Sequence, residues 1–165
     1  MSRYDGCRSS YKNEKNMTIR IGQHADLHAL VQFNQAMAME TENLSLDTEQ
    51  LTRGVEGLLT HPERGVYLVA EVDGEITGSL MVTYEWSDWR ASNYYWIQSV
   101  YIRPQNRRQG IYGKLYQAVK DLAAENGGTA SFRLYVEHDN KIAQKTYESL
   151  GMEQSHYLMY EENTK

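Results

Sequence analysis

The stretch RPQNRRQGIYGKLY, residues 103–116, gathers basic residues and glycines that could bind a phosphate group. It lies between a strand-like run and a helix-like run, so it would expose the unpaired backbone N–H groups of a helix N-terminus, where the helix dipole adds roughly half a positive charge. Gly110 and Gly113 would let an anion approach the backbone or a neighbouring element pack close, and Arg107 and Arg108 would supply charge-assisted hydrogen bonds. The same residues could also form an ordinary solvated helix start with surface arginines.

Two well-known phosphate-binding loops do not fit this stretch. A Walker A loop has four residues between its glycines and Ser or Thr after its lysine, whereas two residues separate Gly110 from Gly113 and Leu115 follows Lys114. A dinucleotide fingerprint needs three glycines near the first strand of a repeated parallel unit, and the chain lacks that arrangement. The loop therefore does not indicate an NTPase or a dehydrogenase.

The hydrophobic pattern around the loop predicts a mixed α+β domain. Helical periodicity predicts helices over residues 24–40, 45–61, 111–125 and 141–150. β-rich runs predict a hairpin that turns at Asp73-Gly74, and the strand-like ranges are 18–23, 66–86, 93–104, 131–137 and 156–161. The order βααβββαβαβ places one βαβ unit, which contains the loop, inside a sheet built mostly from hairpins.

Length and composition predict one globular domain of ordinary size. With 165 residues, 41% hydrophobic and 24% charged residues and a net charge of -5, the chain does not match proteins that bind nucleic acid through bulk charge. No apolar run approaches the roughly 18 residues that a membrane span needs. The single cysteine, Cys7, favours a reducing compartment, so we expect a cytoplasmic protein. We expect residues 1–16 to be a disordered leader and residues 17–165 to form the domain.

Two spaced motifs resemble those of the GNAT superfamily of acyl-CoA N-acyltransferases. Residues 107–112 resemble its pyrophosphate loop, [RQ]-x-x-G-x-[GA]. Downstream, the chain is similar to the family pattern N-x-x-A-x-x-x-Y-x-x-x-G-[FM] at Asn140, Ala143, Tyr147 and Gly151-Met152. The resemblance covers residues 17–161 and implies a mostly antiparallel sheet of six to seven strands flanked by about four helices.

One residue departs from the family pattern. Tyr112 occupies a position that the family usually fills with glycine or alanine, and Gly113 follows one residue later. If Tyr112 contributes only its main-chain N–H, its ring must point aside, either into the core or along the cofactor.

The resemblance implies acetyl-CoA as co-substrate and assigns residues to it. The pyrophosphate would lie on the main-chain N–H groups of Arg108 to Gly113, and the pantetheine arm would lie along the strand before the loop, as an added strand would. Asn140 would steady this arm. The full set implied is Val100, Tyr101, Ile102, Arg107, Arg108, Gln109, Gly110, Ile111, Tyr112, Gly113 and Asn140.

The resemblance also implies direct transfer of an acetyl group to an amine. Tyr147, a phenol with a pKa of about 10, is expected to protonate the leaving thiolate as general acid. The base is less defined, because the strand run YYWIQS at 94–99 contains no carboxylate or histidine. Glu85 is the preferred candidate and Glu137 the other, although either could be a solvated surface residue, and a water chain or an amine already neutral in solution would make a base unnecessary.

The segment EWSDWRASNYYW, residues 85–96, combines aromatic residues with carboxylates. In a substrate pocket this combination would suit a cationic amine with an apolar or flat group, and we expect a small-molecule amine rather than a protein amine. The segment could equally form a dimer seam or ordinary β-sheet packing. The resemblance implies a homodimer as a common assembly of the family.

Three alternatives follow from the same sequence. The missing acidic residue before the loop favours a catalytically idle acyl-CoA-binding or sensing module, whereas the intact downstream motif favours the enzyme. A nucleic-acid site would need more stacking aromatics beside the loop than Tyr112. His24 and His28 are spaced like a zinc pair on a helix, but no third ligand stands out, so we predict no metal site.

Overall fold

A computed structural model describes residues 16–164 of the chain. The strands form one sheet in the order β1-β2-β3-β4-β5. They are β1 (Met17–Ile21), β2 (Gly65–Val72), β3 (Glu75–Ser87), β4 (Ser92–Ile102) and β5 (Ser131–Arg133). The first four pair antiparallel and β5 pairs parallel to β4, which confirms the mixed, mostly antiparallel sheet.

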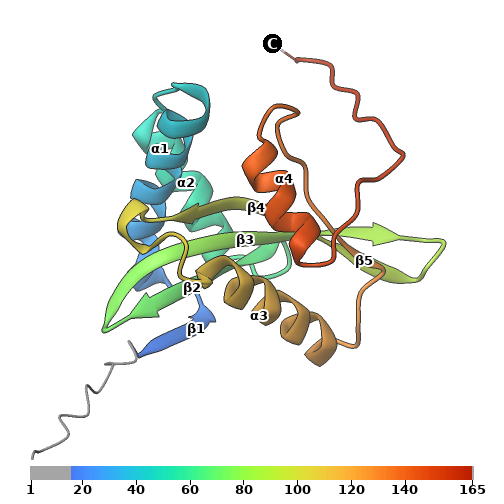
Figure 1. Ribbon diagram of the computed structural model, residues 1–165, viewed down its shortest axis with the longest axis horizontal. Coiled ribbons are helices and arrows are strands. Elements are labelled where there is room, and N and C mark those ends of the chain that lie inside the picture. Colours follow the sequence, from blue (N-terminus) through green and yellow to red (C-terminus); the bar gives the residue numbers. More distant parts are fainter. Residues whose placement is uncertain (1–15, 165) are drawn as a thin grey trace, which may run out of the picture.

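Helices cover both faces of this sheet (Figure 1). They are α1 (Leu27–Glu42), α2 (Thr48–Leu59), α3 (Ile111–Glu125) and α4 (Lys141–Ser149), with short 3-10 turns η1 (His24–Asp26) and η2 (Pro104–Asn106). On one face, Leu30 of α1 and Val55 of α2 pack against Val69 of β2. On the other, Leu115 of α3 packs with Leu80 of β3, and α4 lies beside α3.

Local sequence signals explain the boundaries of several elements. Asp73 and Gly74 both have positive φ, 52° and 83°, as the predicted tight turn between β2 and β3 requires. The side chain of Asp47 caps α2 by accepting a hydrogen bond from the backbone N–H of Gln50 at 2.7 Å. Pro104 follows β4 and opens η2, because proline has no N–H to continue a strand ladder.

The sheet has five strands rather than the expected six to seven, and the difference lies at the C-terminal end. Within the predicted strand 131–137, only Ser131–Arg133 pairs with β4, and the predicted strand 156–161 is irregular. Tyr157, Leu158 and Tyr160 are 73%, 78% and 88% exposed, and Figure 1 shows this segment running away from the sheet. A β-rich pattern gives a segment strand propensity, but the ladder also needs an adjacent edge.

The sequence also predicts a disordered N-terminal leader and no membrane-spanning segment. The disordered leader predicted over residues 1–16 lies, except for its last residue, outside the described residues. Among the helices that the structure describes, none is both long and apolar enough to cross a membrane.

Candidate functional site

A β-bulge interrupts β4 directly before the segment predicted to lie along the pantetheine arm. Ser79 pairs with Tyr101 and Met81 pairs with Gln98. Two residues of β4, Ser99 and Val100, therefore lie opposite the one β3 residue between Ser79 and Met81. Ser99 has φ of 49°, an uncommon conformation for a residue with a side chain. Bulges bend a strand and break its ladder, and this one lies in the pairing of β3 with β4, three residues after the last β4 residue that pairs with β5.

The outer edge of β4 is open beyond this point. β5 pairs only with residues 94–96 of β4, and over the part of the chain that the structure describes no strand pairs with this edge from Ile97 to Ile102. Backbone N–H and C=O groups on an unpaired edge can bind an extended ligand as they would bind another strand.

The loop after β4 forms a turn, residues 108–113, whose geometry suits an anion, and we call it the anion-binding turn for the role that the sequence predicts. Arg108 and Gly110 both have positive φ, 62° and 75°, and α3 begins at Ile111. No backbone N–H of the anion-binding turn donates a hydrogen bond to another described residue, and the first link back is Lys114 N–H to Gly110 C=O at 3.2 Å. The turn therefore offers converging free donors at a helix N-terminus.

The two arginines of the loop lie differently. Arg107 donates from Nη2 to Glu40 Oε2 of α1 at 2.6 Å and from Nε to the carbonyl of Ile102 at 2.9 Å, and its guanidinium lies 5.6 Å from the ring centroid of Tyr101. Arg108 makes no ion pair with any residue in the described range 16–164. Of the two predicted phosphate ligands, Arg107 is thus tied to α1 and Arg108 is the cation available to a ligand.

The ring of Tyr112 turns into the core rather than along the expected cofactor path. It is 9% exposed, stacks parallel to Tyr116 with centroids 6.3 Å apart and meets Tyr147 edge-on at 5.6 Å. Burial raises the pKa of its phenol. Its hydroxyl oxygen is fully buried and has no hydrogen-bond partner among the described residues.

Replacing Tyr112 with phenylalanine is expected to raise the free energy of unfolding by about 1 kcal/mol, because it removes a buried hydroxyl that finds no partner. Urea unfolding measures the change. Tyr116→Phe is the matched control, since Tyr116 belongs to the same stack but its hydroxyl is not among the buried unpartnered groups. A loss of stability in Tyr112→Phe would show that this hydroxyl has a partner.

Helix α4 holds the two predicted residues of the downstream motif. Asn140 is its N-cap, and its side-chain oxygen accepts a hydrogen bond from the N–H of Ala143 at 3.1 Å, which leaves its NH₂ group to donate. Tyr147 is half-buried in the core that α3 shares, and this burial raises the pKa of its phenol. A side chain at Gly113 would make an ordinary contact with Leu150, the C-cap of α4, at 3.8 Å, so the two helices lie side by side here.

Glu85 and Tyr147 lie on opposite faces of the sheet, because Tyr84, the neighbour of Glu85, packs into the core that contains Tyr147. Glu85 Oε2 accepts a hydrogen bond from Trp96 Nε1 at 2.5 Å and contacts Arg133 Nη1 at 3.5 Å. Glu85 pairs with a β4 residue five positions before Ser99, a separation of about 16 Å at the usual rise of a strand. The structure therefore groups Glu85 with Trp96 and Arg133 rather than with the bulge. The sequence analysis did not name Arg133 as a site residue. Side chains at alternate strand positions share one face of a sheet, and this rule could have indicated that Arg133 lies on the same face as its strand neighbours.

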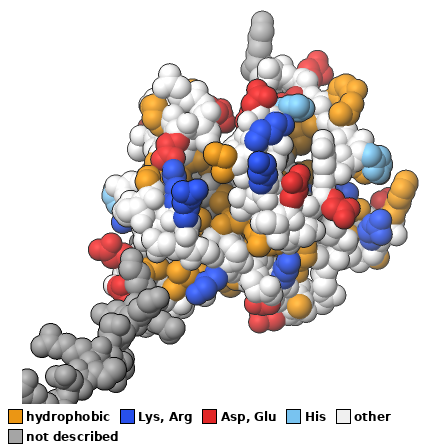
Figure 2. Space-filling model, in the orientation of Figure 1, with side chains coloured by type: hydrophobic (Ala, Val, Ile, Leu, Met, Phe, Trp, Pro, Cys, Tyr) orange, Lys and Arg blue, Asp and Glu red, His pale blue; other side chains and the backbone are white. Residues whose placement is uncertain are grey.

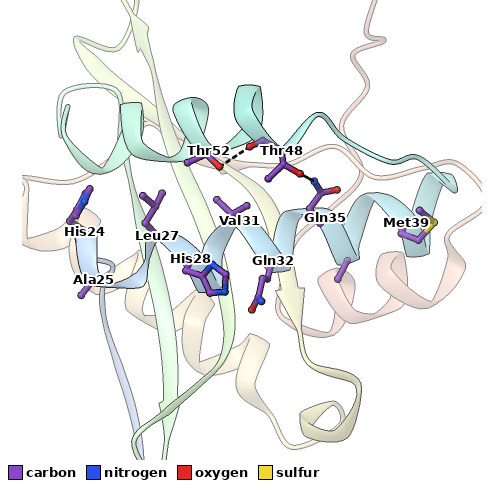
Figure 3. A pocket seen from close by; sticks show the side chains of 11 residues that line it. His24, Ala25, Leu27, His28, Val31, Gln32, Gln35, Met39, Thr48 and Thr52 are labelled. Carbon is purple, nitrogen blue, oxygen red and sulfur yellow. Dashed lines mark hydrogen bonds between the residues drawn. The ribbon is translucent and has the colours of Figure 1, made fainter.

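A groove of about 880 Å³ lies over α1 and α2 and contains none of the predicted site residues. Figure 3 shows its lining, where Gln35 of α1 donates a hydrogen bond to Thr48 Oγ1 of α2 at 3.1 Å. His24 and His28 lie exposed at one end of this groove. Among the described residues, no three His, Cys, Asp or Glu side chains are close enough to hold a metal ion.

Charge around the site is local rather than spread over the surface. On the face seen in Figure 2, basic and acidic side chains are scattered among one another without an extended basic area. The available positive charge near the anion-binding turn comes from Arg108, Lys114 and the helix N-terminus.

Comparison with known proteins gives sequence relatives over about half of the chain. The chain is 32% identical over 98 residues to the uncharacterized N-acetyltransferase YhfO of Bacillus subtilis (strain 168), covering 57% of this chain and 65% of that protein. It is 40% identical over 92 residues to the thialysine N-epsilon-acetyltransferase of Mus musculus, covering 51% and 53%. The matches thus span less than two thirds of these two relatives.

Solved structures match over most of the chain. A possible acetyltransferase from Clostridium difficile 630 is 41% identical, with a TM-score of 0.85, over 90% of this chain and 98% of that one. AAC(6')-Iy, solved with the bisubstrate analog CoA-S-monomethyl-acetylneamine, is 16% identical with a TM-score of 0.73, over 91% of this chain and 99% of that one, and shares the fold. The model of the acetyltransferase (GNAT) family matches residues 27–152, a range that includes the bulge, the anion-binding turn and the whole downstream motif from Asn140 to Met152. The chain therefore belongs to the GNAT family of acetyltransferases, as its two spaced motifs indicate.

Proposed function

We propose that this protein is an N-acetyltransferase that transfers the acetyl group of acetyl-CoA to a small-molecule amine. The observation that carries the proposal is the free N–H groups of the anion-binding turn at the end of a β4 edge that β5 leaves open. A diphosphate and an extended arm need these two features side by side. Membership of the GNAT family supports the same activity.

The residues present fit acetyl-CoA in a definite direction. The pyrophosphate would lie on the anion-binding turn with Arg108 beside it, and the arm would run along β4 from Ile102 back to Val100. Asn140 can donate its free NH₂ to this arm, since only its oxygen caps α4. The thioester would then reach the bulge at Ser99.

The proposed reaction has three steps at the thioester, which are attack by the amine, cleavage of the carbon–sulfur bond and proton transfer to sulfur. The amine nitrogen attacks the thioester carbon, the carbon–sulfur bond breaks, and the leaving sulfur takes a proton from the Tyr147 hydroxyl. The proton that the amine loses restores Tyr147 through water, so the products are an amide and a free thiol. Burial raises the pKa of this phenol above its ordinary value of about 10, so it is protonated and able to donate over the neutral range.

The position of Glu85 supports a contact with the bound acceptor better than a role as the base that removes the proton of the reacting amine. An acting base must come within hydrogen-bond reach, about 3 Å, of the proton it removes. Glu85 is held by Trp96 at a strand position about 16 Å from the bulge, measured along the strand. We therefore propose that water, or uptake of a neutral amine, replaces a dedicated base and that Glu85 acts on the bound acceptor.

The acceptor class is supported by one relative in particular. The mouse protein is named for acetylation of the ε-amine of thialysine, a small molecule. We propose that the acceptor of this chain is likewise a small molecule with a distal primary amine.

Free-thiol release from acetyl-CoA across a panel of amines tests the function. We expect thiol release with at least one small amine, together with a higher melting temperature when acetyl-CoA is added. An idle acyl-CoA-binding module would instead show the higher melting temperature and no thiol with any amine. If acetyl-CoA neither releases thiol nor raises the melting temperature, both the enzyme and the idle binding module are contradicted.

Replacing Gly110 with alanine is expected to weaken acetyl-CoA binding by about tenfold or more, because the turn needs a left-handed residue, a conformation that a side chain disfavours. Gly127→Ala is the matched control. Both glycines have positive φ, 75° and 87°, and open space around the added carbon, but Gly127 follows the other end of α3.

Both substitutions should lower stability similarly, by about 1–2 kcal/mol for a left-handed alanine. Isothermal titration with acetyl-CoA then separates them. Equal affinities in the two variants would mean that the anion does not bind at this turn.

A further inference from the structure

An open shelf lies on the sheet face opposite α3, at the end of β4 that pairs with β5. We define this shelf by Glu85 of β3, Tyr94 and Trp96 of β4, Arg133 of β5 and Tyr135 just beyond it. Alternation along each strand explains the grouping, because the intervening residues Tyr95 and Phe132 pack toward α3 and so turn their neighbours to the other face.

The helices on that face do not reach the shelf. α1 and α2 pack over Tyr67 and Val69 of β2 and Met81 of β3, which lie further along the sheet. Tyr135 is 63% exposed, and the side chains of Glu85 and Arg133 are 47% and 32% exposed. Trp96 packs against the ring of Tyr135 at 6.2 Å, so an apolar surface borders the two charges.

Arg133 is held in place with most of its donors unused. Its guanidinium carbon lies 3.4 Å from the ring centroid of Tyr94 and 5.8 Å from that of Trp96. Within residues 16–164 its one acceptor is Glu85 Oε2, at a long 3.5 Å, although a guanidinium has five N–H donors. A stacked, oriented guanidinium with free donors matches a carboxylate, which it can bind through two parallel hydrogen bonds.

Glu85 complements this arginine. Its Oε2 faces both Trp96 and Arg133, whereas Oε1 makes no hydrogen bond to any described residue. A cation and an anion side by side suit a zwitterion. The same arginine would repel a polyamine, whose charges are all positive.

We propose that the shelf binds the α-amino-acid end of the acceptor, with its carboxylate on Arg133 and its α-ammonium on Glu85. This inference rests on the proposed function. Arg133 pairs with Trp96, which precedes the bulge at Ser99 by three residues, about 10 Å at the rise of a strand. The acceptor therefore carries its reacting amine on a spacer that runs from the shelf toward the bulge, and its α-amine is not the one acetylated.

Pairs of amines that differ only in the carboxylate test this assignment. We name three such pairs, L-lysine with cadaverine, L-ornithine with putrescine, and thialysine with its decarboxylated analogue. In thiol-release assays, the wild-type protein is expected to have a higher kcat/KM for the amino acid than for the diamine in at least one pair. If every diamine matches or exceeds its amino acid, the inference is wrong.

Arg133→Met is expected to lower kcat/KM for the preferred amino acid by about 10- to 100-fold, the loss of a charge-assisted pair. The kcat/KM for the matching diamine should not fall and should rise if the arginine repels it, and the KM for acetyl-CoA should stay unchanged. Arg53→Met is the matched control, because Arg53 forms an exposed ion pair with Glu49 on α2, away from the shelf.

A second variant, Arg133→Lys, keeps the inference testable if Arg133→Met does not fold. Arg133→Lys keeps the charge and the aliphatic stem but loses the planar fork, so it should fold and give a smaller loss than Arg133→Met. If both variants keep the wild-type preference, Arg133 only pairs with Glu85 and the inference fails while the proposed function stands. If no amine releases thiol from acetyl-CoA in the wild-type protein, the proposed function itself fails.

Discussion

Replacing Tyr147 with phenylalanine should lower kcat for acetyl transfer by about 100- to 10,000-fold, the usual contribution of a general acid. The ring would stay in place against Tyr112, so folding and acetyl-CoA affinity should hardly change. Steady-state thiol release gives kcat, and isothermal titration gives the affinity. The proposed chemistry needs this proton because a thiolate is a poorer leaving group than a thiol.

Two controls separate an acid from a packing residue. Tyr116→Phe changes another aromatic residue that contacts Tyr112 and should leave kcat unchanged. An acetyl thioester of a more acidic thiol should be less sensitive to Tyr147→Phe, because its leaving group needs the proton less. Equal losses with both thioesters would argue against the acid role.

The pH dependence follows from the same group. Burial raises the pKa of Tyr147, and an acid must be protonated to act, so loss of activity from its ionisation should begin only above about pH 10. Tyr147→Phe should lack that alkaline loss. A wild-type loss centred well below pH 10 would have to come from another group.

Reversing the charge of Arg108 should weaken acetyl-CoA binding by about 100-fold, since it removes a charge-assisted hydrogen bond and adds repulsion. The loss should shrink as salt concentration rises, because ions screen exposed charges. Titration of Arg108→Glu with acetyl-CoA at two salt concentrations measures both effects. Arg53→Glu makes the same change on α2 and should leave affinity unchanged.

Arg107→Glu gives an informative contrast. Arg107 pairs with Glu40 of α1 at 2.6 Å, so a glutamate there would place two carboxylates together and lower the melting temperature. Arg108→Glu should not lower it, because Arg108 makes no such pair in the described part of the chain. Unchanged affinity in Arg108→Glu would place the pyrophosphate elsewhere.

Local signals explain most of what could be predicted. The Asp73-Gly74 turn, the end of β4 before Pro104 and the start of α3 after Gly110 each depend on the φ that one or two residues prefer. The anion-binding turn is local too, since its free N–H groups belong to consecutive residues. Its prediction therefore needed no knowledge of the rest of the fold.

Side-chain direction was not predictable in the same way. The sequence left two directions for the ring of Tyr112, and packing against Tyr116 and Tyr147 selects the core. The sequence did not distinguish Arg107 from Arg108. In the structure Arg107 forms an ion pair with Glu40, which lies 67 residues earlier in the chain. The sequence offered Glu85 as a candidate base without indicating its neighbours, and the register of β3 on β4 places it beside Trp96.

The sequence by itself determined the order of elements through α4, the family and the position of the turn between β4 and α3, because periodicity, turn residues and short motifs act over a few neighbouring positions. Only the tertiary structure decided the number of strands, the partner of each charge and the grouping of Glu85 with Arg133. These depend on strand register and on contacts between distant segments, whose free energies no local pattern contains.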